Sequence, residues 1–566
     1  TDALTYHFPA AFQWLATGRL GLLETWFFNP ANTYSPLAGS TFIAWLIAPM
    51  GNDILARGVE TPALGMLFFV LLQLCRVLGA SVRIAAIIAL AGCCSRPLIN
   101  QVFLAKDDLF VAAFFGAAVV AMTKQRLQDP LGAVRLGIAL GLLFATKYTA
   151  LLGLPILLLM IDAPRGAGWR ARQYATVLVV ALVLAGPWFL RNWIIAGNPV
   201  FPIAVKIGSI TIFHGMFTPA RSQALRTLAG IFKTFTGYSG LPALPICVIA
   251  VLWIASIARA GTRIKNDPLE RVIALGPLVM FALFLATSPY AEVRFVYPAF
   301  LMMFAGSAIA FARPPLAASQ IGELESPDLR RRERKLRADT PIALLAPLAL
   351  ACITIATSFI PQSLILMIEP TLYALGVIAL IVAAIEFRSI SLSALIIAAV
   401  GVLAFVYWPS YAKQYREGEA DYWTAAYGDL GPAWKFVRDD TPAGATIAYT
   451  NTSFVYPLMG AELDRQLVYA PTRAGVRTIR DLGHVDERVA GEQIVGRIAE
   501  LTFHEPDRET WLDNLRARGA KYLLIAKQRV GSSPPPELKF VEEPSSFRRV
   551  FDNPAAAVYE IVQPVR

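Results

Sequence analysis

The sequence is poor in charged residues, histidine and cysteine, and each scarcity excludes a class of protein. Only 16% of the 566 residues are charged and 56% are hydrophobic, whereas soluble proteins average about 25% charged and about 45–50% apolar residues. This apolar excess needs lipid to bury it, which excludes a soluble globular chain. The five cysteines lie in or beside apolar runs, and no Cys-x-x-Cys pair or His/Cys cluster is present. Neither a zinc site nor a disulfide framework in the polar C-terminal part is indicated.

Nucleotide-binding motifs are also missing. The polar C-terminal part contains no GxGxxG and no Walker motif. The formal net charge of +11 does not indicate nucleic-acid binding, because Lys and Arg accumulate in the cytoplasmic loops of membrane proteins. The composition therefore predicts a polytopic α-helical membrane protein.

Long apolar runs are abundant. A helix that crosses a bilayer needs roughly 20 apolar residues. The sequence predicts about twelve spans within a bundle over residues 62–408, near 62–79, 82–97, 108–123, 133–146, 149–162, 173–190, 240–258, 272–288, 296–312, 341–359, 363–386 and 391–408.

Loop charges predict the orientation. Lys and Arg concentrate in alternate loops, from Arg76 and Arg83 to the run RRRERKLR at 330–337, and these loops are expected in the cytoplasm. The other loops are then extracytoplasmic: 1–61, 98–107, 147–148, 191–239, 289–295 and 360–362. Because the segment 1–61 has no preceding span to carry it across, we expect a further membrane helix before residue 1. The predicted location is a bacterial inner membrane, crossed many times.

Two parts of the chain differ in composition from the spans. Residues 1–61 form a predicted first outer loop, in which residues 10–28 mix aromatic side chains with isolated charges, as interfacial helices do. Residues 412–566 are charged and rich in turn signals, which predicts a small extracytoplasmic α/β domain. The expected strands of this domain are 445–450, 466–471, 521–526 and 556–562. The expected helices are 431–444 and 507–520.

Polar residues recur at the predicted outer ends of the spans, where a lysine or carboxylate is costly and often functional. They include Asp2, Lys106, Asp107, Asp108, Lys147, Arg191 and Arg294. Candidate contacts to a sugar or an acceptor are Tyr6, His7, Tyr34, Tyr148 and Tyr297. By the predicted topology, all of these meet at one membrane face.

Structural alternatives exist for these residues. Asp107 or Asp108 can serve as a helix cap, Lys147 as a side chain that reaches the interface from a short span, and Arg294 as a partner of Glu292. The tyrosines fit an aromatic belt. Against a purely structural reading, the outer loop 191–239 has five Lys or Arg residues and no Asp or Glu. A cationic outer loop suits an anionic ligand such as a lipid phosphate.

These residue types together favour group transfer from a lipid phosphate. An aspartate could serve as general base for an acceptor hydroxyl, and Lys and Arg could hold the departing phosphate. An activated lipid would carry the energy, so no ATP site is required. We expect no cofactor. One isolated carboxylate with a distant second acid is a poor cage for Mg²⁺ or Mn²⁺, so a divalent metal is possible but not supported.

Six motifs resemble those of a known family. They are DALTYHFP, NTYSPLAG, KDDLF, GLLFATKYTALLGLP, GNPVFP and VRFVYP, in order over about residues 1–310. The chain resembles the bacterial C-type (GT-C) glycosyltransferases, the group that includes protein mannosyltransferases, the lipid A aminoarabinose transferase and rhizobial lipopolysaccharide core transferases. The polar C-terminal part is similar to the extracytoplasmic domains that follow the bundle in such enzymes.

The resemblance implies a polyprenyl-phosphate-linked sugar donor, an envelope lipid, glycan or protein as acceptor, and inversion at the anomeric carbon. It maps the presumed base onto Asp2 and the second acid onto Asp107 or Asp108. Phosphate-binding cations map onto Lys147 and Arg294, and less securely onto Lys106 and Arg191. Protein mannosyltransferases have an Asp-Glu pair in the first loop, but Ala3 follows Asp2 here. This departure makes a protein acceptor less expected.

Two other functions remain open at this point. A transporter or flippase of lipid-linked glycans would show internal repeats, broken helices and charged sites near the bilayer midplane, and the sequence has no convincing repeat. A glycan polymerase or ligase would use related chemistry with a larger donor, which the sequence does not exclude.

Overall fold

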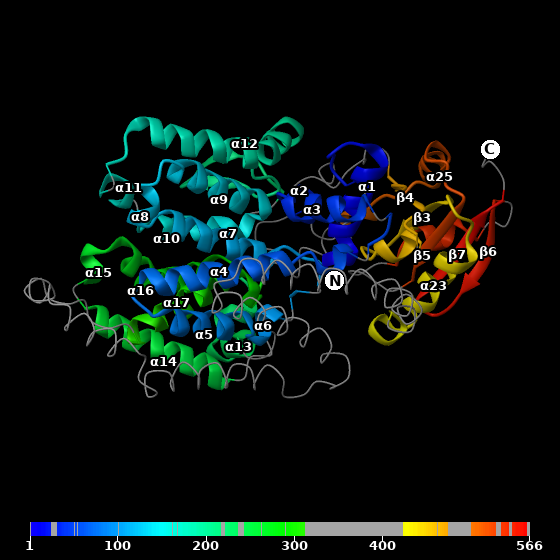
Figure 1. The fold of residues 1–566 in the computed structure, drawn as a ribbon. Coiled ribbons are helices and arrows are strands. Elements are labelled where there is room, and N and C mark those ends of the chain that lie inside the picture. Colours follow the sequence, from blue (N-terminus) through cyan, green and yellow to red (C-terminus); the bar gives the residue numbers. More distant parts are fainter. Residues whose placement is uncertain are drawn as a thin grey trace, which may run out of the picture.

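A helical part and a C-terminal sheet domain make up the structure, a computed structural model of the chain (Figure 1). It describes residues 2–311, 423–527 and 534–562, except 24–30, 50, 54, 100, 103, 161, 167, 217–220, 236–242, 262, 289, 461, 474–499 and 543–545. The spans expected at 341–359, 363–386 and 391–408 lie outside these residues, so the count of about twelve spans stays a prediction.

The N-terminal segment is a series of short helices. They are η1 (Ala3–His7), α1 (Phe8–Thr17), α2 (Ala31–Tyr34), α3 (Ala38–Ile47) and η2 (Leu55–Gly58). The interfacial helix expected over 10–28 begins earlier and ends at Thr17, because Gly18 takes a left-handed φ of 64° that closes the helix. Figure 1 shows α1 and α3 between the helical bundle and the sheet domain.

The bundle contains both long and short helices. In chain order they are α4 (Thr61–Val77), α5 (Val82–Cys93), α6 (Arg96–Ile99), α7 (Asp108–Ala121), α8 (Lys124–Leu127), α9 (Gly132–Thr146), η3 (Tyr148–Gly153), α10 (Leu154–Leu158), α11 (Asp162–Gly166), α12 (Ala171–Ala196), η4 (Gln223–Arg226), α13 (Leu228–Lys233), α14 (Ala243–Ala260), α15 (Arg263–Asn266), α16 (Pro268–Thr287), η6 (Val293–Val296) and α17 (Tyr297–Phe311). Helix α17 is the centre of the packing and contacts α4, α5, α7, α14 and α16.

Three helices of the described residues are long and apolar enough to cross a membrane: Leu55–Val77, Ala171–Ala196 and Pro268–Thr287. Several expected spans correspond to shorter apolar helices, among them α5, α7, α9 and α17. The span expected at 149–162 also corresponds to a shorter apolar helix, Tyr148–Leu158. It begins as a six-residue 3-10 helix and continues directly into the five-residue α10.

The C-terminal domain contains a five-stranded sheet of order β4-β3-β5-β7-β6. Its elements are α23 (Leu430–Asp440), β3 (Thr446–Thr450), η8 (Tyr456–Met459), β4 (Gln466–Tyr469), α25 (Arg508–Ala517), β5 (Tyr522–Ala526), α26 (Glu537–Phe540), β6 (Phe547–Asp552) and β7 (Ala556–Ile561). Strand β3 pairs in parallel with β4 and β5, and β7 pairs antiparallel with β5 and β6. The four expected strands are confirmed.

Three strands were not predicted. One is β6, and the other two are β1 (Val205–Ile207) and β2 (Ile210–Phe213), which form an antiparallel hairpin. Strands β1 and β2 have only three and four residues, and all three strands are mostly exposed or half-buried, so they lack the buried apolar run that identifies β5. Helix α23 ends at Asp440, before the residue 444 expected for it, because Thr441 leaves the helical conformation and is followed by Pro442.

The sheet domain packs on the first loop. The Tyr456 ring of η8 stacks on Phe8 with 4.7 Å between ring centroids, and its hydroxyl donates to the buried Asp53 carboxylate. Apolar residues of α1, α3 and η8 form one buried cluster around this contact. The domain therefore lies at the end of the bundle where η1 begins, and α8, α11 and α15 lie at the opposite end (Figure 1).

Candidate functional site

A lysine between two carboxylates marks one end of the bundle. The antiparallel packing of α7 and α9 brings the start of α7 beside the end of α9. Lys147 Nζ lies 3.0 Å from Asp107 Oδ1 and 2.9 Å from Asp108 Oδ1. Both carboxylates are buried, at 1% and 2% exposure, so their charges require this nearby cation.

Arg294, in η6, extends the cluster to the N-terminal segment. Its Nη1 donates to Asp108 Oδ2 at 3.1 Å and to Asp2 Oδ2, and its Nε pairs with Glu292. Lys106 Nζ lies 3.8 Å from the same Asp2 oxygen. Six of the candidate residues thus form one cluster, which we call the charge cluster: Asp2, Lys106, Asp107, Asp108, Lys147 and Arg294.

Asp2 differs from the other two aspartates in its accessibility. Its side chain is 20% exposed, which leaves it open to a ligand. Burial by itself would raise the pKa of Asp2, but Arg294 and then Lys106 and Lys147 outweigh that effect and hold the pKa well below its usual range. The carboxylate is therefore ionised at neutral pH and is stabilised by cations that an anionic ligand could compete for.

His7 also lies against Asp107, facing the same carboxylate oxygen as Lys147. Its Nδ1 is 2.9 Å from Ser40 Oγ, and its Nε2 is 3.9 Å from Asp107 Oδ1. Burial lowers the pKa of His7 to about 4, so the ring is neutral at pH 7. Gly39 provides the room for this arrangement, because a methyl group there would come within 2.6 Å of Asp107 Cβ.

The backbone before the charge cluster turns sharply. Ala105 takes a left-handed φ of 45°, an uncommon conformation for a residue with a side chain. The turn directs the chain from the loop after α6 into Lys106, Asp107 and the first turn of α7. Such backbone strain persists only where the surrounding structure enforces it, and it is often found at functional sites.

The capping role considered for the two aspartates is filled mainly by another residue. Asp107 occupies the N-cap position of α7 but makes no side-chain capping hydrogen bond. The backbone N–H of Leu109 instead donates to Glu60 Oε1 at 3.2 Å. Glu60 is fully buried and was missed as a site residue. Its position directly before the first apolar run was the available signal.

Arg191 lies in a second, neighbouring group of polar residues. Its Nη2 is 3.3 Å from the carbonyl oxygens of Tyr34 and Ser35, and its guanidinium stacks over Trp188. Its Nη1 is buried and has no hydrogen-bond partner among the described residues. A buried donor of this kind suits an anionic ligand, since an unmade hydrogen bond is costly.

The tyrosines have largely structural contacts. The Tyr148 hydroxyl lies 2.8 Å from the Phe201 carbonyl oxygen and accepts a hydrogen bond from Asn192 at 2.8 Å. The Tyr297 hydroxyl donates to the Pro97 carbonyl at 3.1 Å. Tyr6 is buried and packs against His7, with ring centroids 4.1 Å apart. Direct contact of these tyrosines with a sugar or an acceptor stays a prediction.

The carboxylates of the charge cluster have cations between them. Throughout the described part of the chain, no group of three or more His, Cys, Asp or Glu side chains is placed to hold a metal ion. The arrangement can instead stabilise an added anion, because Lys106, Lys147 and Arg294 can redistribute their hydrogen bonds.

Comparison with known proteins gives a fold relationship but no match in sequence. No family model matches the chain, and no curated protein matches it. Among solved structures, the chain is similar to ArnT from Cupriavidus metallidurans bound to undecaprenyl phosphate, with a TM-score of 0.51, 14% identity and coverage of 98% of this chain and 93% of that one.

Two further structures are more distant. They are the Archaeoglobus fulgidus oligosaccharyltransferase in the apo form, with a TM-score of 0.41, 12% identity and coverage of 93% and 66%, and the mycobacterial arabinofuranosyltransferase AftD, with a TM-score of 0.42, 13% identity and coverage of 93% and 37%. Of these three structures, only ArnT has a TM-score above 0.5, so the fold relationship is drawn from it. The chain shares the overall fold of ArnT, and this likeness of fold agrees with the resemblance seen in the sequence motifs.

Proposed function

We propose that this chain is a membrane glycosyltransferase. It transfers a sugar from a polyprenyl-phosphate-linked donor to a hydroxyl of a cell-envelope lipid, glycan or protein, with inversion at the anomeric carbon. The observation that carries the proposal is the charge cluster, in which Lys106 and Arg294 lie beside the partly exposed Asp2 at one end of the bundle and Lys147 lies behind them on Asp107 and Asp108. The fold likeness to ArnT bound to undecaprenyl phosphate supports a polyprenyl-linked donor.

The proposed reaction is a single displacement. Asp2 accepts the proton of the acceptor hydroxyl as the hydroxyl oxygen forms a bond to the anomeric carbon. The bond between that carbon and the phosphate oxygen breaks, and its electron pair leaves with the polyprenyl phosphate. Arg294 and Lys106, with Lys147 behind them, stabilise the charge that develops on the leaving phosphate. Arg191 adds a further donor through its unused Nη1.

Donor binding would also activate the base. In the free protein, Arg294 and Lys106 hold the pKa of Asp2 low, which makes it a weak proton acceptor. A donor phosphate that takes hydrogen bonds from these two cations reduces their effect on Asp2. The pKa of Asp2 then rises toward the usual aspartate value of about 3.9, so the carboxylate becomes a better base when the donor is present.

The buried aspartates have a different role in this proposal. Asp107 and Asp108 fix Lys147 and Arg294 in position, and His7, which is held by Ser40, lies beside Asp107. The reaction takes place at the outer face of a bacterial inner membrane. The first loop (1–61) and the α/β domain (412–566) are both extracytoplasmic and flank the bundle (62–408).

The test measures sugar transfer by the full-length protein, its Asp2→Asn variant and its Asp162→Asn variant. Asp162 is a matched control, because its carboxylate is 59% exposed and pairs with Arg271 at a distance from the charge cluster. Each protein is incubated with radiolabelled polyprenyl-phosphate sugars and bacterial membranes, and the label that leaves the lipid carrier is followed.

The expected result is transfer by the wild type and by Asp162→Asn, and a loss of about 10²–10⁴-fold in Asp2→Asn, the usual contribution of a general base. The labelled product identifies the acceptor. Unchanged transfer in Asp2→Asn would remove the role of base from this residue. Movement of lipid-linked sugar between leaflets without transfer would favour a flippase, and joining of whole glycans would favour a polymerase or ligase.

A further inference from the structure

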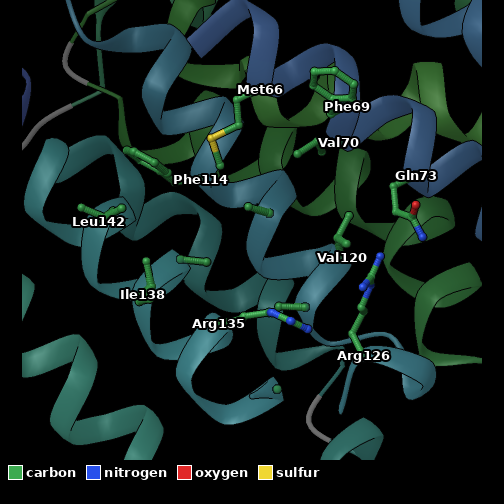
Figure 2. A pocket seen from close by; sticks show the side chains of 14 residues that line it. Met66, Phe69, Val70, Gln73, Phe114, Val120, Arg126, Arg135, Ile138 and Leu142 are labelled. Atoms are coloured by element: carbon green, nitrogen blue, oxygen red, sulfur yellow. The ribbon is translucent and has the colours of Figure 1, made fainter. Parts of the chain in front are cut away.

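An apolar groove with two arginines at one end lies between α4, α7 and α9, on the side of the bundle remote from the charge cluster. Its volume is about 380 Å³, within the range of about 300–1,000 Å³ that is usual for ligand sites. Figure 2 shows apolar side chains such as Phe69, Phe114 and Ile138 along the groove, and Arg126 and Arg135 together at one end.

The groove opens toward the surroundings of the bundle. Phe69 is 50% exposed and Ile138 is 41% exposed, so its walls face lipid where α4 crosses a membrane. The charge cluster lies at the start of α7, whereas Arg126 lies in α8, directly after the end of α7. The groove therefore runs from the middle of the bundle to the end opposite the charge cluster.

The arginines at this end carry more charge than their neighbours neutralise. Asp129 pairs with Arg135 at 2.8 Å and also interacts electrostatically with Arg126, with which it forms no ion pair within 4 Å, so in the described parts of the chain one carboxylate serves both arginines. The residues that line the groove include no Asp or Glu. A tight turn holds Arg126 in place, because the Asp129 N–H donates to its carbonyl and Gly132 packs closely against the same carbonyl.

We propose that this groove binds one anionic phospholipid of the leaflet opposite the charge cluster. An acyl chain lies along the apolar walls, and the phosphate accepts hydrogen bonds from Arg126 and Arg135, with Gln73 of α4 as a further polar contact at the same end of the groove. Basic pockets between membrane helices are typical sites for anionic headgroups. The inference does not depend on the proposed transferase activity, because the two sites lie at opposite ends of α7.

The test is binding of phosphatidylglycerol to the full-length protein in detergent, measured by native mass spectrometry. Four forms are compared: the wild type, Arg126→Gln/Arg135→Gln, Ala117→Phe and Arg165→Gln/Arg172→Gln. Ala117 lines the groove, so a phenylalanine there blocks the acyl chain and leaves the charges in place. Arg165 and Arg172 are exposed residues outside the groove and control for the loss of two charges.

One phosphatidylglycerol per chain is expected in the wild type and in the Arg165/Arg172 control. Affinity should fall at least about tenfold in the Arg126/Arg135 variant, since each cation near a headgroup contributes about a fivefold effect, and should fall similarly in Ala117→Phe. Equal binding by all four forms would overturn the proposal. So would equal retention of phosphatidylcholine, or displacement of phosphatidylglycerol by equimolar undecaprenyl phosphate, which would make the groove a donor site.

Discussion

Replacement of Lys147 by methionine should destabilise the protein strongly, because it removes the cation shared by two buried carboxylates. Asp108 would keep Arg294 at 3.1 Å. Among the described residues, Asp107 would keep only His7, at 3.9 Å and neutral at pH 7. Loss of one partner of a buried ion pair costs about 3–5 kcal/mol. Since Lys147 is 13% exposed and Asp108 retains a partner, we expect a loss of about 3 kcal/mol.

The assay is thermal unfolding of the full-length protein in detergent between pH 5 and pH 8. The pKa of His7 is lowered by burial, and Lys147 lowers it further, while Asp107 opposes both effects. Lys147 repels a positive charge on the His7 ring, whereas Asp107 attracts one. Without Lys147 that repulsion is gone, so the pKa of His7 rises. The protonated ring then takes the place of the missing cation beside Asp107. A group whose pKa is raised in the folded state stabilises the fold at low pH, and this stabilisation is lost as the pH rises. The difference between Lys147→Met and wild type should therefore be smaller at pH 5 than at pH 8.

Two controls separate this explanation from a general loss of packing. The double variant Lys147→Met/Asp107→Asn removes the uncompensated charge and should recover most of the lost stability. Lys106→Met deletes a similarly buried lysine, but its partner Asp2 is more exposed and keeps Arg294, so its cost should stay below about 1 kcal/mol. The reasoning is refuted if Lys147→Met unfolds like the wild type, or if Asp107→Asn fails to rescue it.

Three further predictions concern other contacts. Gly39→Ala should displace Asp107 and reduce transfer more than it reduces the unfolding temperature, and equal transfer rates would contradict this. Tyr456→Phe removes the hydrogen bond to Asp53 and should cost about 1–3 kcal/mol, seen as faster proteolytic release of the C-terminal domain; an unchanged cleavage rate would refute it. Burial raises the pKa of Glu537 to about 7, so its stabilising contribution falls as pH rises from about 4.5 to 7. Glu537→Gln should remove this slope in pH-dependent unfolding, and a persistent slope would point to another group.

The contact of Lys147 with Asp107 and Asp108 could be predicted from the sequence. Residues 108–123 and 133–146 read as consecutive apolar segments with a short connection, which places them antiparallel, and the start of the first must then lie near the end of the second. The charges also suit the helix ends, because Asp108 lies in the first turn of α7 and Lys147 follows the last turn of α9. The sequence analysis placed these three residues at one membrane face but did not predict their ion pairs, although the antiparallel spans carried the signal for them.

The rest of the charge cluster could not be paired in this way. Asp2 and Arg294 are 292 residues apart, and Arg294 lies in a short 3-10 helix that no periodicity marks. Their contact depends on how η1 packs on the bundle, which is a matter of tertiary structure. Glu60 was missed for a similar reason. It accepts a hydrogen bond from the backbone N–H of Leu109, which lies 49 residues further along the chain.

The unequal burial of the aspartates determines which substitution tests function cleanly. Asp107 and Asp108 are almost fully enclosed and hold Lys147 and Arg294, so an inactive variant at either position could reflect displaced cations or a weakened fold. Asp2 is partly exposed, and without it Arg294 still pairs with Asp108 and Glu292. Loss of transfer in Asp2→Asn at an unchanged unfolding temperature would therefore report on the reaction itself. Loss of both transfer and stability would assign Asp2 to the same structural role as Asp107 and Asp108.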